Sequence, residues 1–447
     1  MKSHLSNALY GLLDYGSYPV GMLIVAPIIL RHRGPSEYGI WTITTALVSI
    51  GGILASGFGD ANIQQLASRL GSSEGRLGID SDLTRVVRTM MSIHLALGIV
   101  LAVVAWLTTP VLAFHISVAE PGSYVQCLWC FRLASILILT RAIETVCVST
   151  QRAFQRYGTS IRISITMRLM CLAFAALLAI AGQDIILIVA STAALTVAGL
   201  WLQLRDLKRL FAGASLMPAL DYTELSGLFS FGIFSWLIAV SGMTFNQIDR
   251  LMLGTSLGAT ALASYALCAQ LTQPVYGLCS SGLHFIFPYL VHRRASDSLA
   301  SLHKPVFLVF TSNLLLVAAT TAFLMIFGNQ LLKLWIGNEI AVQAASILPT
   351  LALGSGLLAL NVTATYSLGA LGHMKTVTCF NVVGGAAMFA MMFYLMPRYG
   401  PQGVAIAKLV YGIFALGMYL PLIRSLRLPH TDQTNLPDAC APTCEEA

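Results

Sequence analysis

Charged residues are scarce in this sequence. Only 10% of its 447 residues are Asp, Glu, Lys or Arg, whereas 56% are hydrophobic, and the mean hydropathy is +0.76. A soluble globular protein carries charge on about a quarter of its residues, so this composition excludes that class. The sequence instead predicts an all-α integral membrane protein that crosses the bilayer many times.

The sequence also lacks the motifs of nucleotide-driven and hydrolytic chemistry. It contains no GxxxxGK[ST] loop, no His/Glu metalloprotease motif and no convincing Ser-His-Asp set. Cys127 and Cys130 form a single CxxC without a second pair, which is a weak metal signature. We therefore expect no catalytic residues, no metal and no cofactor, and a protein that is not an enzyme.

Strand-like alternation punctuated by turns is missing as well, which argues against a barrel. What the sequence does contain is a series of apolar segments long enough to cross a hydrocarbon core of about 30 Å. Twelve such segments are expected, roughly at residues 9–30, 39–60, 90–112, 124–148, 163–182, 184–204, 227–253, 260–290, 305–327, 341–367, 376–396 and 402–423. We expect about twelve transmembrane helices, arranged as two six-helix bundles around a central cavity.

The chain divides near its midpoint, where a polar stretch containing Pro218 interrupts the apolar segments. The expected parts are an N-terminal bundle at 1–210, a cytoplasmic linker at 211–226, a C-terminal bundle at 227–428 and a disordered cytoplasmic tail at 429–447. The two halves echo each other, because Gly34 and Gly258 each follow the first span of a half and precede a Tyr. Six helices per half make this a parallel repeat.

Lys and Arg indicate how the chain is oriented. With the N-terminus on the cytoplasmic side, 17 of the 26 basic residues fall in inner segments, five in outer loops, among them Arg250, and four within spans. This asymmetry predicts that both termini are cytoplasmic. It also accounts for the net charge of +7, so no nucleic-acid partner is expected. The expected outer loops are short and leave no room for a folded domain.

Several short motifs then occur in a characteristic order. They are GPSEYGIW at 34–41, NQIDRLMLG at 246–254, SYALCAQLTQP at 264–274, LWIGNE at 334–339, GALGHMK at 369–375 and RYGPQGVAIA at 398–407. In order and spacing the chain resembles the bacterial polysaccharide-transporter-type flippases of the multidrug/oligosaccharidyl-lipid/polysaccharide exporter superfamily. The resemblance covers residues 6–427.

The resemblance implies a location, a fold and a cargo. Such a protein lies in the bacterial inner membrane as a V-shaped pair of six-helix bundles around an often cationic cavity. It flips undecaprenyl-diphosphate-linked oligosaccharides for O-antigen, exopolysaccharide or capsule. The implied partners are this lipid-linked oligosaccharide, membrane lipids and polysaccharide polymerase or export machinery.

Two charged residues lie deep within spans and are candidate site residues. Asp14 interrupts the first span on a polar stripe, and it is interpreted as a partner of a cation, a coupling-proton carrier or an interhelical hydrogen-bond acceptor. Arg132 lies about eight residues into the fourth span, too deep to reach water easily. We expect Arg132 to bind the substrate diphosphate, with a structural arginine as the alternative.

Further charges lie on the same and other spans. Arg141 and Glu144, three residues apart, face each other on one helix, so they form either an internal salt bridge or part of the site, where Glu144 is a possible coupling residue. Arg141 lies nine residues from Arg132, so at most one of the two is expected to face the cavity. Arg168, near an inner helix end, is expected to snorkel. Lys408 lines the cavity or reaches the outer interface.

Uncharged polar residues complete the candidate binding set. Gln270 and Gln273 interrupt the eighth span, and Asn246 lies on a polar stripe of the seventh. Amides suit sugar hydroxyls, and they equally suit helix–helix hydrogen bonds. Asp249 beside Arg250 is interpreted as a structural pair at the membrane edge.

Two other functions compete with lipid-linked glycan transport. An ion-coupled multidrug exporter of the same superfamily would favour an acidic or aromatic pocket over a cationic one. A membrane-embedded glycan polymerase or ligase would need a sizeable outer loop with catalytic groups, and the short outer loops argue against it.

Overall fold

The computed structural model describes the backbone of residues 2–72, 81–154, 156–211, 214–222, 236, 247–283, 286, 289–290 and 302–427, with most side chains from residue 16 onward. The Asp14 side chain, Asn246, most of the expected seventh span and the expected tail at 429–447 lie outside this part. The descriptions below concern the described residues.

Every regular element within these residues is helical, which confirms the all-α prediction. The elements are α1 (Lys2–Ser56), α2 (Gly59–Ser72), α3 (Ser81–Ala119), α4 (Tyr124–Ala153), α5 (Tyr157–Ile180), α6 (Ile185–Leu210), α8 (Ile248–Leu257), α9 (Ala259–Gly282), α11 (His303–Ile336), α12 (Asn338–Ala345), α13 (Ile347–Ala370), α14 (Met374–Tyr399), α15 (Pro401–Ala415), the 3₁₀ turn η2 (Leu416–Met418) and α16 (Tyr419–Arg427). In the described part, nine helical stretches are long and apolar enough to cross a membrane. The chain is therefore a multi-pass membrane protein.

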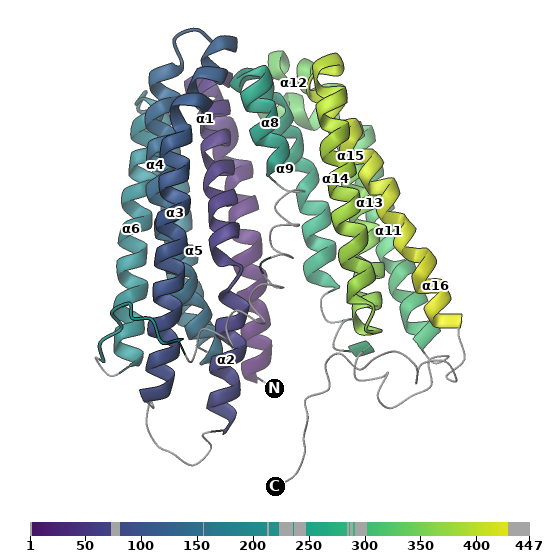
Figure 1. Ribbon diagram of the computed structural model, residues 1–447. Coiled ribbons are helices and arrows are strands. Elements are labelled where there is room, and N and C mark those ends of the chain that lie inside the picture. Colours follow the sequence, from purple (N-terminus) through teal and green to yellow (C-terminus); the bar gives the residue numbers. More distant parts are fainter. Residues whose placement is uncertain are drawn as a thin grey trace.

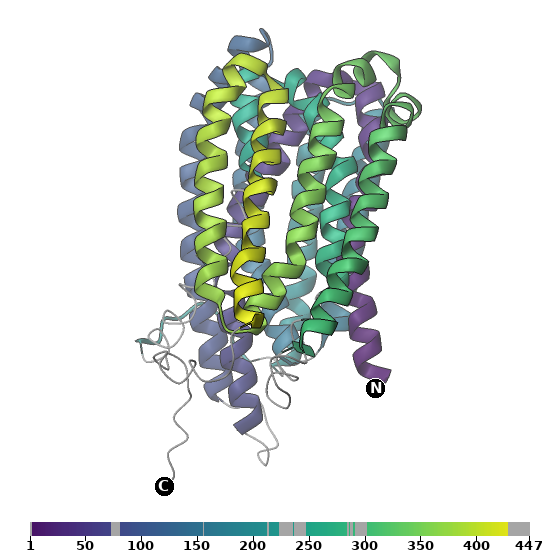
Figure 2. The ribbon, with the colours of Figure 1, turned by 90° about the vertical axis from the view of Figure 1, so that its right-hand side faces the viewer.

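The helices form two groups. Helices α1–α6 make an N-lobe, and α8–α16 make a C-lobe, with most helices running the length of the molecule (Figures 1 and 2). The lobes approach each other at one end, here called the closed end. They diverge toward the other end, where α1 begins and α16 ends (Figure 1).

A bend in α1 supplies two membrane legs from one helical run. Gly34 has φ 80° and ψ 173°, a conformation that residues with a Cβ rarely adopt. The expected spans 9–30 and 39–60 lie on either side of it. Gly258, between α8 and α9, has nearly the same angles, φ 88° and ψ 170°. Gly34 and Gly258 hold equivalent places in the two halves of the sequence, and their similar backbone angles agree with a parallel repeat.

The lobes touch directly at the closed end. A Cβ added to Gly39 of α1 would lie 2.0 Å from the carbonyl oxygen of Ala259 in α9, so only glycine permits this approach. Nearby, the Trp335 indole of α11 donates a hydrogen bond of 2.6 Å to the carbonyl of Leu23. Arg31 in turn donates to the Trp335 carbonyl at 3.3 Å.

The segment expected as a linker lies against α3 at the diverging end of the molecule. Residues 214–221 have no regular secondary structure, and the Met217 carbonyl accepts a 3.0 Å hydrogen bond from Arg88 Nε. The Asp221 amide donates to the Thr89 hydroxyl at 3.3 Å. The chain thus returns along the N-lobe before it enters the C-lobe.

Candidate functional site

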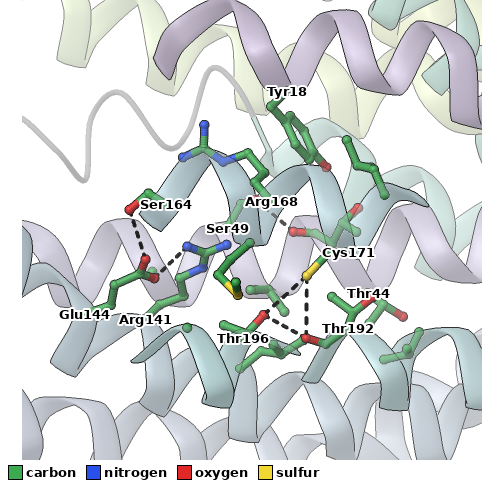
Figure 3. Close-up of a pocket in the computed structure, with 18 of the residues that line it drawn as sticks. Tyr18, Thr44, Ser49, Arg141, Glu144, Ser164, Arg168, Cys171, Thr192 and Thr196 are labelled. Atoms are coloured by element: carbon green, nitrogen blue, oxygen red, sulfur yellow. Dashed lines mark hydrogen bonds and ion pairs between the residues drawn. The ribbon is translucent and has the colours of Figure 1, made fainter. Parts of the chain in front are cut away.

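A cavity of about 640 Å³ lies inside the N-lobe, between α1, α4, α5 and α6. Its wall also includes Gln247, immediately before α8, so the cavity extends to the C-lobe. The polar side chains that line it come from all four N-lobe helices (Figure 3). The cavity is therefore placed where the two lobes face each other.

An ion pair forms one wall of the cavity. Arg141 Nη1 lies 2.7 Å from Glu144 Oε2, one turn along α4, which confirms that the two residues face each other. The Ser164 hydroxyl of α5 donates to the other Glu144 oxygen at 3.5 Å. The Arg141 side chain is 40% exposed, so its guanidinium remains accessible from the cavity although it is paired.

A second arginine lines the same cavity. Arg168 of α5 donates from Nη1 to the Ser17 hydroxyl at 3.4 Å and lies beside Tyr18 (Figure 3). Two guanidiniums and the Glu144 carboxylate therefore line the cavity, and their formal charges leave an excess of positive charge. Arg250 of α8 lies three residues after Gln247, the C-lobe residue in the cavity wall.

Neither Arg168 nor Arg250 has the position that the sequence predicts for it. Arg168 near a helix end is expected to snorkel, but it lines the cavity. Arg250 is expected in an outer loop, but it lies in α8, where Nη2 donates to Gln273 Oε1 at 3.0 Å.

The opposite wall of the cavity is polar without being charged. Thr192 and Thr196 of α6 bond to carbonyls of their own helix, at 3.0 and 2.8 Å, and Cys171 of α5 lies within 4.0 Å of Thr196 Oγ1 (Figure 3). Threonine is common in membrane helices, so these residues do not stand out in the sequence as site residues. Their shared spacing on α6 is the only signal that could have found them.

Arg132 lies away from this cavity. Its guanidinium carbon is 5.0 Å from the ring centre of Trp106 in α3 and 5.3 Å from that of Trp129. Arg141, nine residues on, lines the cavity. This division agrees with the prediction that at most one of the two arginines faces inward. Binding of substrate by Arg132 stays a prediction from the sequence, and the cavity described here does not include this residue.

Lys408 neither lines this cavity nor reaches the outer interface. Its Nζ lies 2.5 Å from Asp249 Oδ2, and both side chains are nearly inaccessible, at 11% and 1% exposure. The Tyr265 hydroxyl donates to the same oxygen at 2.6 Å. The Asp249 side chain is therefore paired with Lys408 of α15 rather than with the side chain of Arg250 at a membrane edge.

The two glutamines on α9 are both engaged. Gln270 donates to the Tyr38 hydroxyl across the lobes at 2.9 Å, and Gln273 accepts from Arg250. The structure therefore uses both amides for contacts between helices. Of the remaining candidates, Asp14 and Asn246 have no described side chain.

Comparison with known proteins agrees with this architecture. The fold is shared by a solved structure titled "Lipid II flippase MurJ, inward closed conformation". Its TM-score is 0.75, with 10% identity, and the match covers 94% of this chain and 89% of that one. It is also shared by an inward-facing multidrug resistance MATE family transporter of the MOP superfamily, with a TM-score of 0.66 and 14% identity, over 92% of this chain and 98% of that one.

The sequence itself matches more specifically. A protein of Shigella flexneri described as "Putative O-antigen transporter" is 21% identical over 420 residues, which are 91% of this chain and 94% of that protein. The profile of a family described as "Polysaccharide biosynthesis protein" matches residues 28–345. These matches confirm the resemblance found in the sequence, and the chain belongs to the polysaccharide biosynthesis protein family.

Proposed function

We propose that the protein is a flippase that moves undecaprenyl-diphosphate-linked oligosaccharides across the bacterial inner membrane. The family and the "Putative O-antigen transporter" relative support glycan transport, as does the likeness to a lipid II flippase in fold. The observation that carries the proposal is the cavity beside Tyr18. Its excess of positive charge matches a diphosphate, because a guanidinium offers a planar fork of donors to phosphate oxygens.

The diphosphate binds by replacing Glu144 as the partner of Arg141. Arg141 is paired with Glu144, and a phosphate oxygen would compete with that carboxylate. Glu144 would then be released, which makes it the candidate coupling residue of the described part. Arg168 and Arg250 supply charge from the two lobes, while Gln273 positions Arg250.

Transport follows from movement of the lobes. The proposed architecture has twelve membrane helices in two six-helix bundles, with both termini in the cytoplasm. The closed end then faces outward, and the diverging end receives the headgroup from the cytoplasmic leaflet (Figure 1). The hydrocarbon tail stays in the lipid. The contact between Gln270 and Tyr38 must separate when the closed end opens. Delivered glycan passes to the polymerase and export machinery.

The test measures substrate binding and export in Arg168→Gln and Arg250→Gln variants. A hydrogen bond from a charged donor contributes about 1.5–3 kcal/mol, so each variant is expected to raise the Kd for undecaprenyl diphosphate by about 10- to 100-fold. Surface glycan in a strain lacking its own flippase is expected to fall in parallel. Arg398→Gln is the matched control, because it removes the same charge from an exposed residue of α14.

Unchanged binding in both variants would contradict the assignment of the cavity. Lost glycan with unchanged binding would also contradict it, because the arginines would then act in some step other than phosphate recognition. Loss of binding in Arg398→Gln to the same degree would reduce the result to an effect of net charge.

A second function, ion-coupled multidrug export, is favoured by one observation. The cavity contains the Glu144 carboxylate and the rings of Tyr18 and Trp41, which suit a lipophilic cation. The two functions differ in the effect of Glu144→Gln. An exporter of cations loses drug binding in this variant, whereas a flippase binds the diphosphate more tightly, because Arg141 loses its competitor.

A further inference from the structure

The outer surface of the N-lobe carries a guanidinium that the proposed transport site does not use. Arg132 is half-buried on α4, and its charge lies against the rings of Trp106 and Trp129. The two indoles are 43% and 46% exposed. The cluster of these three residues is therefore at the surface.

The neighbours of this cluster identify the surface as lipid-facing. On α4, Val125, Trp129, Arg132 and Ile136 follow one another at intervals of four, three and four residues, so they share one stripe. The three apolar members are 44–57% exposed. On the adjacent α3, Leu107 is 69% exposed. In a chain that spans a bilayer, such an apolar stripe contacts acyl chains.

Arg132 has no acidic partner in the described part of the chain. No carboxylate there lies within ion-pair distance, and the buried Nε has no acceptor among these residues. A cation within a bilayer is unfavourable unless an anion or water compensates it. The two indole faces stabilise the charge through cation–π interactions, but they accept no conventional hydrogen bond. The site therefore lacks an anion with hydrogen-bond acceptors.

The depth of Arg132 indicates where that anion lies. Helix α4 has 30 residues and begins at Tyr124, so it is about 45 Å long and Arg132 lies about 12 Å below its start. A bilayer with its headgroups is about 40–45 Å thick, so at this depth the guanidinium lies below bulk water but within reach of the lipid phosphates at the closed end. Tryptophans are enriched at that boundary.

We propose that Trp106, Arg132 and Trp129 bind the phosphate of an anionic phospholipid in the leaflet at the closed end. The guanidinium binds the phosphate oxygens, and the indoles pack against the glycerol and upper acyl chains. The bound lipid belongs to the bilayer and is not cargo. The site does not depend on the proposed transport function, because it lies on the outer surface of the N-lobe.

The test is native mass spectrometry of the full-length protein in detergent, titrated separately with phosphatidylglycerol, undecaprenyl diphosphate and inorganic phosphate. Arg132→Gln is expected to weaken phosphatidylglycerol binding about tenfold, as loss of a charge-assisted hydrogen bond would. Trp106→Leu, which keeps the apolar surface, is expected to weaken it less. Inorganic phosphate is expected not to bind, because it lacks the acyl chains.

Arg424→Gln is the matched control, because Arg424 is an exposed arginine of α16 with no ring contact in the described part. Equal loss of phosphatidylglycerol in Arg424→Gln and Arg132→Gln would overturn the site. If Arg132→Gln weakened the binding of undecaprenyl diphosphate alone, the proposed site would also be overturned. Arg132 would then be assigned to binding of the transported substrate. Unchanged lipid binding in folded Arg132→Gln would exclude any phosphate ligand.

Discussion

Lys408 and Asp249 join α15 to α8 inside the C-lobe, where neither charge is solvated. Their 2.5 Å contact and the hydroxyl of Tyr265 compensate for the lost water. Removing one partner leaves the other charge buried without compensation, which costs more than the pair contributes. At the scale of single residues, one substitution in this pair is therefore expected to lower stability strongly.

We predict that Lys408→Met lowers the free energy of unfolding by about 3–5 kcal/mol. The double variant Lys408→Met, Asp249→Asn is expected to recover part of this loss, because no unpaired charge then remains. Thermal unfolding of the purified protein in detergent measures both. Lys375→Met, at an exposed lysine of α14, is the control and should have little effect. The pairing would be contradicted if the double variant lost more unfolding free energy than the summed losses of Lys408→Met and Asp249→Asn.

The sequence predicts that Arg141 and Glu144 face each other, but it misses the ion pair between Lys408 and Asp249. Arg141 and Glu144 are one turn apart, so helical periodicity alone brings them together. Lys408 and Asp249 lie on different helices, and their contact depends on how those helices pack. For the same reason, periodicity separates Arg132 from Arg141 but does not tell which of the two faces the cavity.

At the scale of elements, the closed end depends on a contact between the end of α3 and the start of α9. Glu120 Oε1 accepts a hydrogen bond of 2.5 Å from the Thr260 amide, and its other oxygen accepts from the Ser36 hydroxyl. A carboxylate is favourable at a helix N-terminus because of the unpaired amides and the helix dipole. Glu120 thus caps a C-lobe helix from the N-lobe.

We predict that Glu120→Gln weakens this cap and shifts the protein toward a conformation in which the closed end is open. Spin labels at Val118 and Leu334, both exposed, in a background without native cysteines should report an increased population of longer distances. Glu339→Gln is the control, because Glu339 lies in the first turn of α12 and is exposed there. Equal distance distributions in Glu120→Gln and the unsubstituted protein would show that the cap does not hold the lobes.

The helices themselves follow from sequence to a large extent. Apolar length marks the legs of α1 and the helices α3–α6, and glycine marks the bends at Gly34 and Gly258. The cap by Glu120 was not predicted, because it joins segments 140 residues apart. The helix ends follow less well, since the expected span 90–112 is part of a helix that runs from Ser81 to Ala119, and contacts between helices select which end of the molecule closes.

At the scale of the whole molecule, the start of α1 and the end of α16 lie at the same, diverging end (Figure 1). The turn between α5 and α6 lies at the closed end, since Arg33 beside the α1 bend donates to the Gly182 carbonyl at 3.0 Å. The basic residues that sequence analysis assigns to inner segments include those of α2 and the end of α6. Charge and geometry together predict that the diverging end is cytoplasmic.

Reporter fusions test this orientation. Alkaline phosphatase fused after Gln183 is expected to be active, because the preceding turn lies at the closed end and would face the periplasm. The same reporter fused after Phe211, at the end of α6, is expected to be inactive, whereas a fluorescent protein there should fluoresce. The two positions are separated by one helix, so they serve as controls for each other. The reverse pattern would show that the protein has the opposite orientation in the membrane. The closed end would then face the cytoplasmic leaflet, from which the substrate must enter.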